Sequence, residues 1–324
     1  MKICHDRGGI FLFSNFIVAV SAVVPIFVLI GIGLLVQRAH LLTKEELAHT
    51  NRLVFRVFFF FTLFSNIYNA DFADGFNPRL MLFGAAAVTL LFLGGLAFSC
   101  LFEPLRKRRG AMTQAIFRSN FIILGLPLVV NIFGEDGALV PTMMVAVIIP
   151  LYNIYAVLAL ETFRGGTFRL LPILRGVLKN PMIDGMLLGF LCRLLPFPLP
   201  DPLLRPLMQV GAATTPLALI ILGASFRRGG ISESRRDLWA CVFIRLIAAP
   251  ALVLTAAALL GFRGVEFVTL LAIFATPCAV ASYAMAQQMG SDAALAGNTV
   301  VFTSALSCFT LFGWIFLTKT LGLF

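Results

Sequence analysis

The feature that most constrains this chain is a series of long apolar runs without charged side chains. Residues 80–101, with the sequence LMLFGAAAVTLLFLGGLAFSCL, are one such run, and about 20 apolar residues suffice for a helix to cross a bilayer. A transmembrane barrel would instead alternate apolar and polar residues with a period of two. Because backbone groups inside lipid must be satisfied by hydrogen bonds within the protein, these continuous runs predict an all-α polytopic membrane protein.

The composition indicates the same class of protein. Charged residues make up 12% of the 324 residues and apolar residues make up 60%, whereas a soluble domain carries about 25% charge. A soluble core of this length would not hide so much apolar surface, which argues against a soluble enzyme, a disordered chain or a secreted disulfide scaffold. The six cysteines lack metal-ligand spacing and are expected to be apolar fillers.

Ten apolar segments are predicted to span the membrane. The first follows a short tail over residues 1–14 and is too long for the apolar core of a cleaved signal peptide. The approximate limits of the ten segments are 15–37, 50–70, 80–102, 111–133, 139–160, 180–196, 203–226, 238–261, 265–289 and 294–318.

Lysine and arginine are distributed unequally between the two sides of the predicted membrane. The loops that follow the odd-numbered spans carry 15 of these residues, and the opposite side carries seven. The positive-inside rule assigns the basic side to the cytoplasm, so both termini are expected outside. The net charge of +10 is explained by these loops, and no nucleic-acid partner is predicted.

An odd number of spans in each half of the chain predicts an inverted repeat. The first five-helix repeat covers residues 15–160, a cytoplasmic linker covers 161–179, and the second repeat covers 180–324. The second half would then enter the membrane upside down relative to the first, as in many secondary transporters.

The fourth and ninth predicted spans are interrupted at corresponding places. The fourth contains Asn120, Gly125 and Pro127, and the ninth contains Pro277 followed by Ser282. A proline removes a backbone donor and clashes with the preceding helical turn. Helices interrupted by glycine or proline at matching positions of two halves are the best sequence indication of a transport site.

Three motifs in these spans are specific. They are N-x-x-x-x-G-x-P-L at residues 120–128, P-L-A-L-x-x-L-G at 216–223 and T-P-x-A-x-x-S-Y-x-M-A at 276–286. With these motifs the chain resembles the auxin efflux carrier family, which includes the plant PIN carriers and bacterial malonate-type transporters. Ser119 and Phe60 depart from the family pattern, which often has proline at those places.

The resemblance implies ten helices in two inverted five-helix repeats, with broken fourth and ninth helices that cross near the middle of the membrane. Helices one, two, six and seven would form a scaffold, and the others a moving transport domain. The resemblance also implies transport of a small organic anion, such as malonate or another mono- or dicarboxylate, and a homodimer. The expected location is the bacterial cytoplasmic (inner) membrane.

A pair of broken helices can bind an anion through backbone groups. Each half-helix that starts inside the membrane directs unpaired N–H groups, equivalent to about half a positive charge, at the crossing. Two such ends can hold a carboxylate. The residues expected to form the substrate site are Ser119, Asn120, Gly125, Thr215, Thr276, Pro277, Ser282 and Tyr283.

Some of these residues have a second interpretation. Asn120 could cap its own half-helix, and Thr215 could bond to a carbonyl of its own helix. Pro127, Pro216 and Pro277 are expected to break their helices.

Three ionisable residues within or at the edge of the spans are further candidates. Arg118 either neutralises an anion or extends to the membrane surface. Arg245 lies deeper, where an arginine is a functional candidate, although the sequence names no partner for it. Asp184 is either a proton acceptor or an acid of the first helical turn. The sequence does not reveal whether H⁺ or Na⁺ is the coupling ion.

An enzyme is not expected. The three histidines lie near or outside the membrane ends, and no HExxH, GxSxG or GxxxxGK[ST] motif occurs. No cofactor or metal is predicted. The favoured function is a secondary transporter that works by alternating access, and the alternative is a passive channel or a substrate sensor with a transporter fold.

Overall fold

The structure is a computed structural model that describes residues 23–69, 77–164, 170–195, 197–226 and 233–324. The predicted tail over 1–14 and the start of the first span lie outside this part of the chain. The described residues contain one isolated β-bridge and otherwise only helices. In chain order the helices are Val23–Arg38, α2 (Lys44–Leu53), η1 (Val54–Phe58), α3 (Phe59–Tyr68), α4 (Pro78–Phe102), α5 (Arg106–Phe117), η2 (Phe121–Gly125), α6 (Leu126–Phe133), η3 (Glu135–Ala138), α7 (Leu139–Arg164), α8 (Leu170–Leu178), α9 (Pro181–Arg193), α10 (Asp201–Ala224), α12 (Arg235–Phe243), η4 (Ile244–Ala248), α13 (Ala249–Leu259), α14 (Gly264–Ala275), α15 (Ala281–Gln288) and α16 (Ala293–Thr320).

Within the described part of the chain, five helical segments are long and apolar enough to cross a membrane without interruption. Shorter apolar helices cover Val23–Arg38, Phe121–Phe133 and Gly264–Ala275. The chain is therefore an all-helical membrane protein with several crossing segments, as the apolar runs predicted. The five long segments are Pro78–Phe102, Leu139–Arg164, Asp201–Ala224, Arg235–Leu259 and Ala293–Thr320.

Polar residues at the helix starts explain several boundaries. Asn77 caps α4 and Asn180 caps α9, and each is followed by a proline at the first helical position, where the missing N–H costs nothing. Thr43 and Glu46 form a capping box at the start of α2. The backbone N–H and hydroxyl of Thr43 both donate to the Glu46 carboxylate and lower its pKa.

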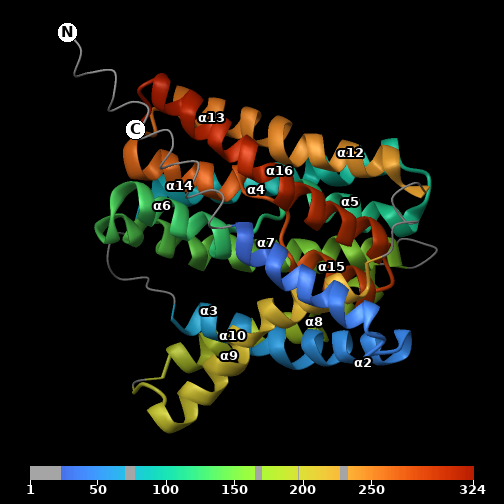
Figure 1. Cartoon of the computed structure of the whole chain (residues 1–324). Coiled ribbons are helices and arrows are strands. Elements are labelled where there is room, and N and C mark those ends of the chain that lie inside the picture. Colours follow the sequence, from blue (N-terminus) through green and yellow to red (C-terminus); the bar gives the residue numbers. More distant parts are fainter. Residues whose placement is uncertain (1–22, 70–76, 165–169, 196, 227–232) are drawn as a thin grey trace.

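The helices pack in two groups, which Figure 1 shows one above the other. The small group consists of the helix Val23–Arg38, α2, η1, α3, α9 and α10, and the large group consists of α4 to α7 and α12 to α16. In the small group, the backbones of the first helix and α10 touch at Gly33 and Gly223, where a Cβ on either glycine would collide with the other helix.

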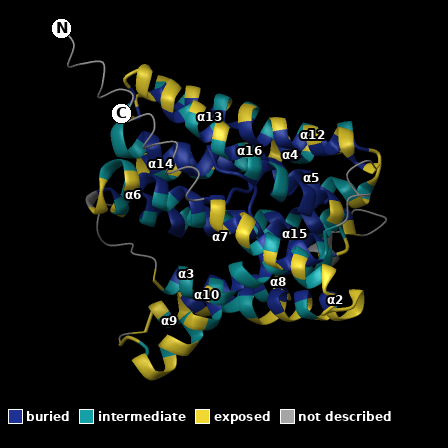
Figure 2. Cartoon of the chain, viewed as in Figure 1, coloured by how far each residue is buried: buried dark blue, intermediate teal, exposed yellow. Residues whose placement is uncertain are grey.

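The centre of the large group is its most buried part. Figure 2 shows buried ribbon around α14 and exposed residues on the outer faces of helices such as α13. Every residue from Phe267 to Ala275 in α14 is buried. Leucines on the outer faces, such as Leu82 and Leu252, are about 70% exposed (73% and 68%), as expected for side chains that contact lipid.

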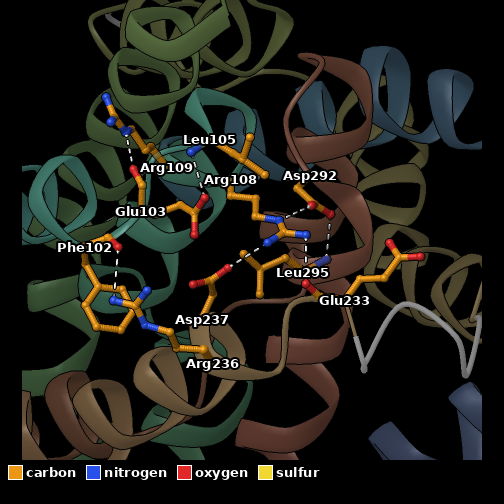
Figure 3. Close-up of polar contacts among 10 residues, drawn as sticks. All are labelled: Phe102, Glu103, Leu105, Arg108, Arg109, Glu233, Arg236, Asp237, Asp292 and Leu295. Atoms are coloured by element: carbon orange, nitrogen blue, oxygen red, sulfur yellow. Dashed lines mark hydrogen bonds and ion pairs between the residues drawn. The ribbon is translucent and has the colours of Figure 1, made fainter.

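A charged network joins helix ends of the large group on its basic side (Figure 3). The Arg108 guanidinium lies 3.1 Å from Asp237 Oδ2 and 3.3 Å from Asp292 Oδ2. It also donates to Glu233 O at 3.0 Å. Because Asp292 caps the start of α16 and Asp237 lies in the first turn of α12, Arg108 ties three helix starts together.

Candidate functional site

Two helices of the large group are interrupted, and their interruptions lie side by side. One break covers residues 118–120, between α5 and η2, and the other covers residues 276–280, between α14 and α15. An antiparallel β-bridge joins Ser119 to Cys278. The backbone N–H of Asn120 donates to Pro277 O at 2.8 Å. The interruptions predicted in the fourth and ninth spans are therefore present, and they pair with each other.

Arg245 occupies the space behind the two breaks and is fully buried. Its guanidinium donates to Thr276 O (3.0 Å), Ile116 O (3.2 Å), Ile273 O (3.2 Å) and Phe274 O (2.7 Å). Carbonyls at a helix C-terminus lack partners within the helix and form the negative end of its dipole. Arg245 thus satisfies the ends of α5 and α14, and these carbonyls are the partners that the sequence could not name.

Arg118 lies in the first break and has a different environment. Its side chain is buried, and it donates to Asn153 Oδ1 at 2.7 Å and to Gln114 Oε1 at 3.3 Å. It also contacts the sulfur of Met285. All of these partners are neutral, and no ion pair joins Arg118 to a carboxylate among the described residues. Its positive charge is therefore held inside the protein without a countercharge.

A cavity of about 120 Å³ lies between the first break and the small group. It is large enough for several water molecules or a small organic molecule. Its walls come from α3, α7, α9 and α10 and from both breaks. The polar and charged lining residues are Thr62, Asn66, Arg118, Ser119, Asn120, Tyr152, Asn153 and Thr215.

The starts of two half-helices also line this cavity. Residues 121–123 open η2, and residues 279–281 lead into α15. The first N–H groups of a helix have no partner within it, so these two ends present donors and partial positive charge.

Asn120 is a buried polar residue of the cavity wall whose side-chain amide nitrogen lacks a hydrogen-bond partner among the described residues. Its side chain is 5% exposed, and its Nδ2 has no hydrogen-bond partner in the described part of the chain. Its side chain makes no capping hydrogen bond to η2. The structure therefore does not contain the alternative arrangement, in which Asn120 caps its own half-helix. A buried amide donor without a partner costs roughly 1–3 kcal/mol, which a bound acceptor would offset.

Ser119 and Thr215 also line the cavity, from opposite groups of helices. Ser119 Oγ lies 3.0 Å from the hydroxyl of Tyr152 in α7. Thr215 is half-buried in α10 and faces the same space.

Other residues expected at the site lie behind the cavity wall. Thr276 Oγ1 donates to Ala272 O of its own helix at 2.8 Å. Gly125 packs against the backbone of α14, where an added Cβ would lie 2.8 Å from Ala272 O. Pro277 contributes its carbonyl to the pairing of the breaks. These three residues shape the breaks and do not line the cavity.

Ser282 and Tyr283, in the first turn of α15, also do not line the cavity. Ser282 is buried, and its Oγ lies 3.6 Å from Cys278 Sγ. Tyr283 lines a separate cavity with Gln37, Ser225 and Asn298.

All three prolines were expected to break their helices, but two of them do not. Pro127 lies in the first turn of α6, beyond the break at 118–120 and directly after the wide π-turn of η2. Pro216 lies inside α10, which runs without interruption. The hydroxyl of Thr62 lies beside the turn that precedes this proline, 2.9 Å from Gly211 O and 2.6 Å from Thr214 Oγ1, and also 3.0 Å from Phe58 O of its own helix. Only Pro277 lies in a break.

Asp184 is exposed in the first turn of α9 and does not line the cavity. This position agrees with the interpretation as a first-turn acid near the positive helix end.

Four further polar residues line the cavity without having been predicted from the sequence: Thr62, Asn66, Tyr152 and Asn153. Tyr152 and Asn153 lie in a long apolar span and are almost fully buried, at 1% and 2% exposure. A polar pair inside an apolar span was a usable signal, since such residues usually face the protein interior.

Comparisons with known proteins agree with the membrane-crossing architecture. The sequence model of the family described as membrane transport protein matches residues 18–170 and 167–315. An uncharacterized transporter of Methanocaldococcus jannaschii is 23% identical over 321 residues, which cover 93% of this chain and 99% of that protein. An uncharacterized transporter of Methanothermobacter thermautotrophicus is 24% identical over 306 residues, which cover 92% and 98% of the two chains.

Proposed function

Since the chain belongs to the auxin efflux carrier family of membrane transport proteins, we propose that it is a secondary transporter that moves a small organic anion. The observation that carries this proposal is the cavity at the paired breaks, where Arg118 is the one charged residue among the described residues of the lining. A buried cation without a countercharge is costly. A bound anion offsets that cost, because it supplies the missing negative charge.

The proposed substrate is a mono- or dicarboxylate such as malonate. One carboxylate accepts hydrogen bonds from Arg118 and from the free Nδ2 of Asn120. The N–H groups at the starts of η2 and α15 add partial positive charge from the other side. Phe59, Leu63 and Ile149 form apolar walls that suit the carbon skeleton of a small acid.

Alternating access is the proposed mechanism, with the small group as scaffold and the large group as transport domain. The cavity lies between the groups, so a relative displacement would change the side from which it is reached. On the basic side, α15 contacts α2, η1 and α10. Asn51 Nδ2 lies 3.5 Å from Ala284 O there. These contacts would close the cytoplasmic side in this conformation.

The remaining architecture follows from the same proposal. We propose ten spans in two inverted repeats, over residues 15–160 and 180–324, with both termini outside. The chain would lie in the cytoplasmic membrane as a homodimer, with H⁺ or Na⁺ as the coupling ion. The breaks at 118–120 and 276–280 lie at corresponding places in the two halves, which supports the repeat.

The test is uptake of radiolabelled malonate into proteoliposomes that contain the purified protein. A carrier predicts that preloading with unlabelled malonate stimulates uptake, because exchange is faster than net movement. Protein-free liposomes and the Arg118→Gln variant are the controls. Uptake without stimulation by the preload indicates a channel, and binding without uptake indicates a sensor. Substitution of Na⁺ by choline, and collapse of the proton gradient, separate the two coupling ions.

A further inference from the structure

A second cavity, of about 630 Å³, lies on the side that the positive-inside rule assigns to the cytoplasm. We call it the basic cavity. Arg56 of η1 and Asn180 line it from the small group, and Arg164 at the end of α7 lines it from the large group. Arg175 and Lys179, at the end of α8, complete its cationic rim.

The charges around the basic cavity are unbalanced. One lining residue, Glu161, is acidic, and it pairs with Arg164 at 3.0 Å. Arg56, Arg175 and Lys179 form no ion pair with a carboxylate among the described residues. Three cations, one from η1 and two from the end of α8, therefore face one space without a countercharge among the described residues, which suits an oxyanion such as a phosphate group.

Helix α8 packs closely against the Glu161 side chain of α7 at Gly176. A Cβ added at Gly176 would lie 2.6 Å from the carboxyl carbon of Glu161. The glycine thus lets α8 lie directly on the end of α7, and this contact holds Arg175 and Lys179 at the rim.

The surroundings of the cavity favour a lipid as the source of the phosphate. Leu171 and Leu178 of α8 are 78% and 68% exposed. A short helix with exposed leucines beside cations is typical of a segment that lies in the membrane interface. Basic pockets between transmembrane helices on the cytoplasmic side are suited to anionic headgroups.

We infer that the basic cavity binds the phosphate of an anionic phospholipid from the cytoplasmic leaflet. Arg56 belongs to the small group and Arg164 to the large group, so the bound headgroup bridges the two. Such a lipid would bias their relative displacement. The inference does not depend on the proposed substrate, because the binding is measured without transport.

The experiment is a lipid titration of the purified full-length protein in a neutral detergent, followed by native mass spectrometry and by thermal melting. Phosphatidylglycerol is expected to be retained and to raise Tm, whereas phosphatidylcholine is not. Glycerol 3-phosphate tests whether a soluble phosphate compound, without lipid chains, binds the basic cavity. If it binds as tightly as the lipid and displaces it, the lipid assignment is overturned.

Substitutions of residues that line the basic cavity test whether phosphatidylglycerol binds there. The double variant Arg175→Gln/Lys179→Gln is expected to weaken phosphatidylglycerol binding about 25-fold, at about fivefold for each cation. Glu161→Gln is expected to strengthen it about fivefold, which a purely structural role of these residues would not produce. The matched control is Arg38→Gln, an exposed arginine that does not line this cavity. An equal loss in the control, or unchanged affinity in the double variant, would overturn the inference.

Discussion

The two breaks lie side by side but contribute different groups to the cavity. The break at 118–120 directs Arg118, Ser119 and Asn120 into the central cavity. In the break at 276–280, the polar groups are used inside the protein. There Thr276 bonds within its own helix, and the backbone N–H of Cys278 donates to Thr303 Oγ1 at 3.1 Å. The first break thus contributes polar side chains to the cavity wall, whereas the second contributes residues 279 and 280, which carry no polar side chain.

The two buried arginines follow the same division. Arg245 makes its hydrogen bonds to backbone carbonyls of both interrupted helices, whereas Arg118 bonds to side-chain amides and borders the cavity. Arg245 therefore stabilises the breaks, and Arg118 is available to a ligand. The predictions below test this division, from the largest expected effect to the smallest.

Arg245→Met is expected to have the largest effect, because it leaves the carbonyls at the ends of α5 and α14 without donors. A loss of roughly 3–5 kcal/mol of stability follows. Thermal melting in detergent measures it. Arg245→Lys keeps the charge but has fewer donors in a different geometry, so it should melt between the wild type and Arg245→Met. A wild-type Tm in Arg245→Met would show that the breaks do not depend on this residue.

Arg118→Gln is expected to impair transport far more than folding. Removal of the charge should raise the malonate concentration for half-maximal uptake by roughly 30-fold, or about 2 kcal/mol. Tm should change little, because glutamine can still bond to the neighbouring amides. Proteoliposome uptake and melting are measured on the same preparation. A variant with normal uptake would remove Arg118 from the site.

Asn120→Ala is expected to raise the malonate concentration for half-maximal uptake about tenfold, since one hydrogen bond to a charged group contributes roughly 1.5 kcal/mol. Stability should be unchanged or slightly higher, because Nδ2 has no partner in the described part of the chain. A large fall in Tm with normal uptake by the folded fraction would instead assign Asn120 a structural role.

Thr276→Val is expected to have the smallest effect. It removes one hydrogen bond to the carbonyl of Ala272, so a loss of about 1 kcal/mol of stability is expected with unchanged half-maximal uptake. This variant is the counterpart of Asn120→Ala in the other break. If Thr276→Val impaired substrate affinity as strongly, the contrast between the breaks would be wrong.

The sequence by itself determined the class of the protein and the places where two helices are interrupted. Apolar runs of about 20 residues leave few structures other than transmembrane helices, because lipid supplies no hydrogen bonds to the backbone. Asn120 and Pro277 marked the breaks, since glycine, proline and short polar residues disfavour a continuous helix locally. The motifs at 120–128, 216–223 and 276–286 together also indicated the family.

Only the tertiary structure decided which residues face the cavity and which support it. The sequence placed Arg118 and Arg245 alike within or at the edge of spans, and Pro127, Pro216 and Pro277 alike as helix breakers. Their roles differ because a neighbouring helix supplies or withholds hydrogen-bond partners. Thr62 of α3 lies beside α10 at Pro216, and the ends of α5 and α14 surround Arg245. The contacts of Thr62 with Gly211 and of Arg245 with Ile116 join residues 149 and 129 positions apart, and packing alone brings them together.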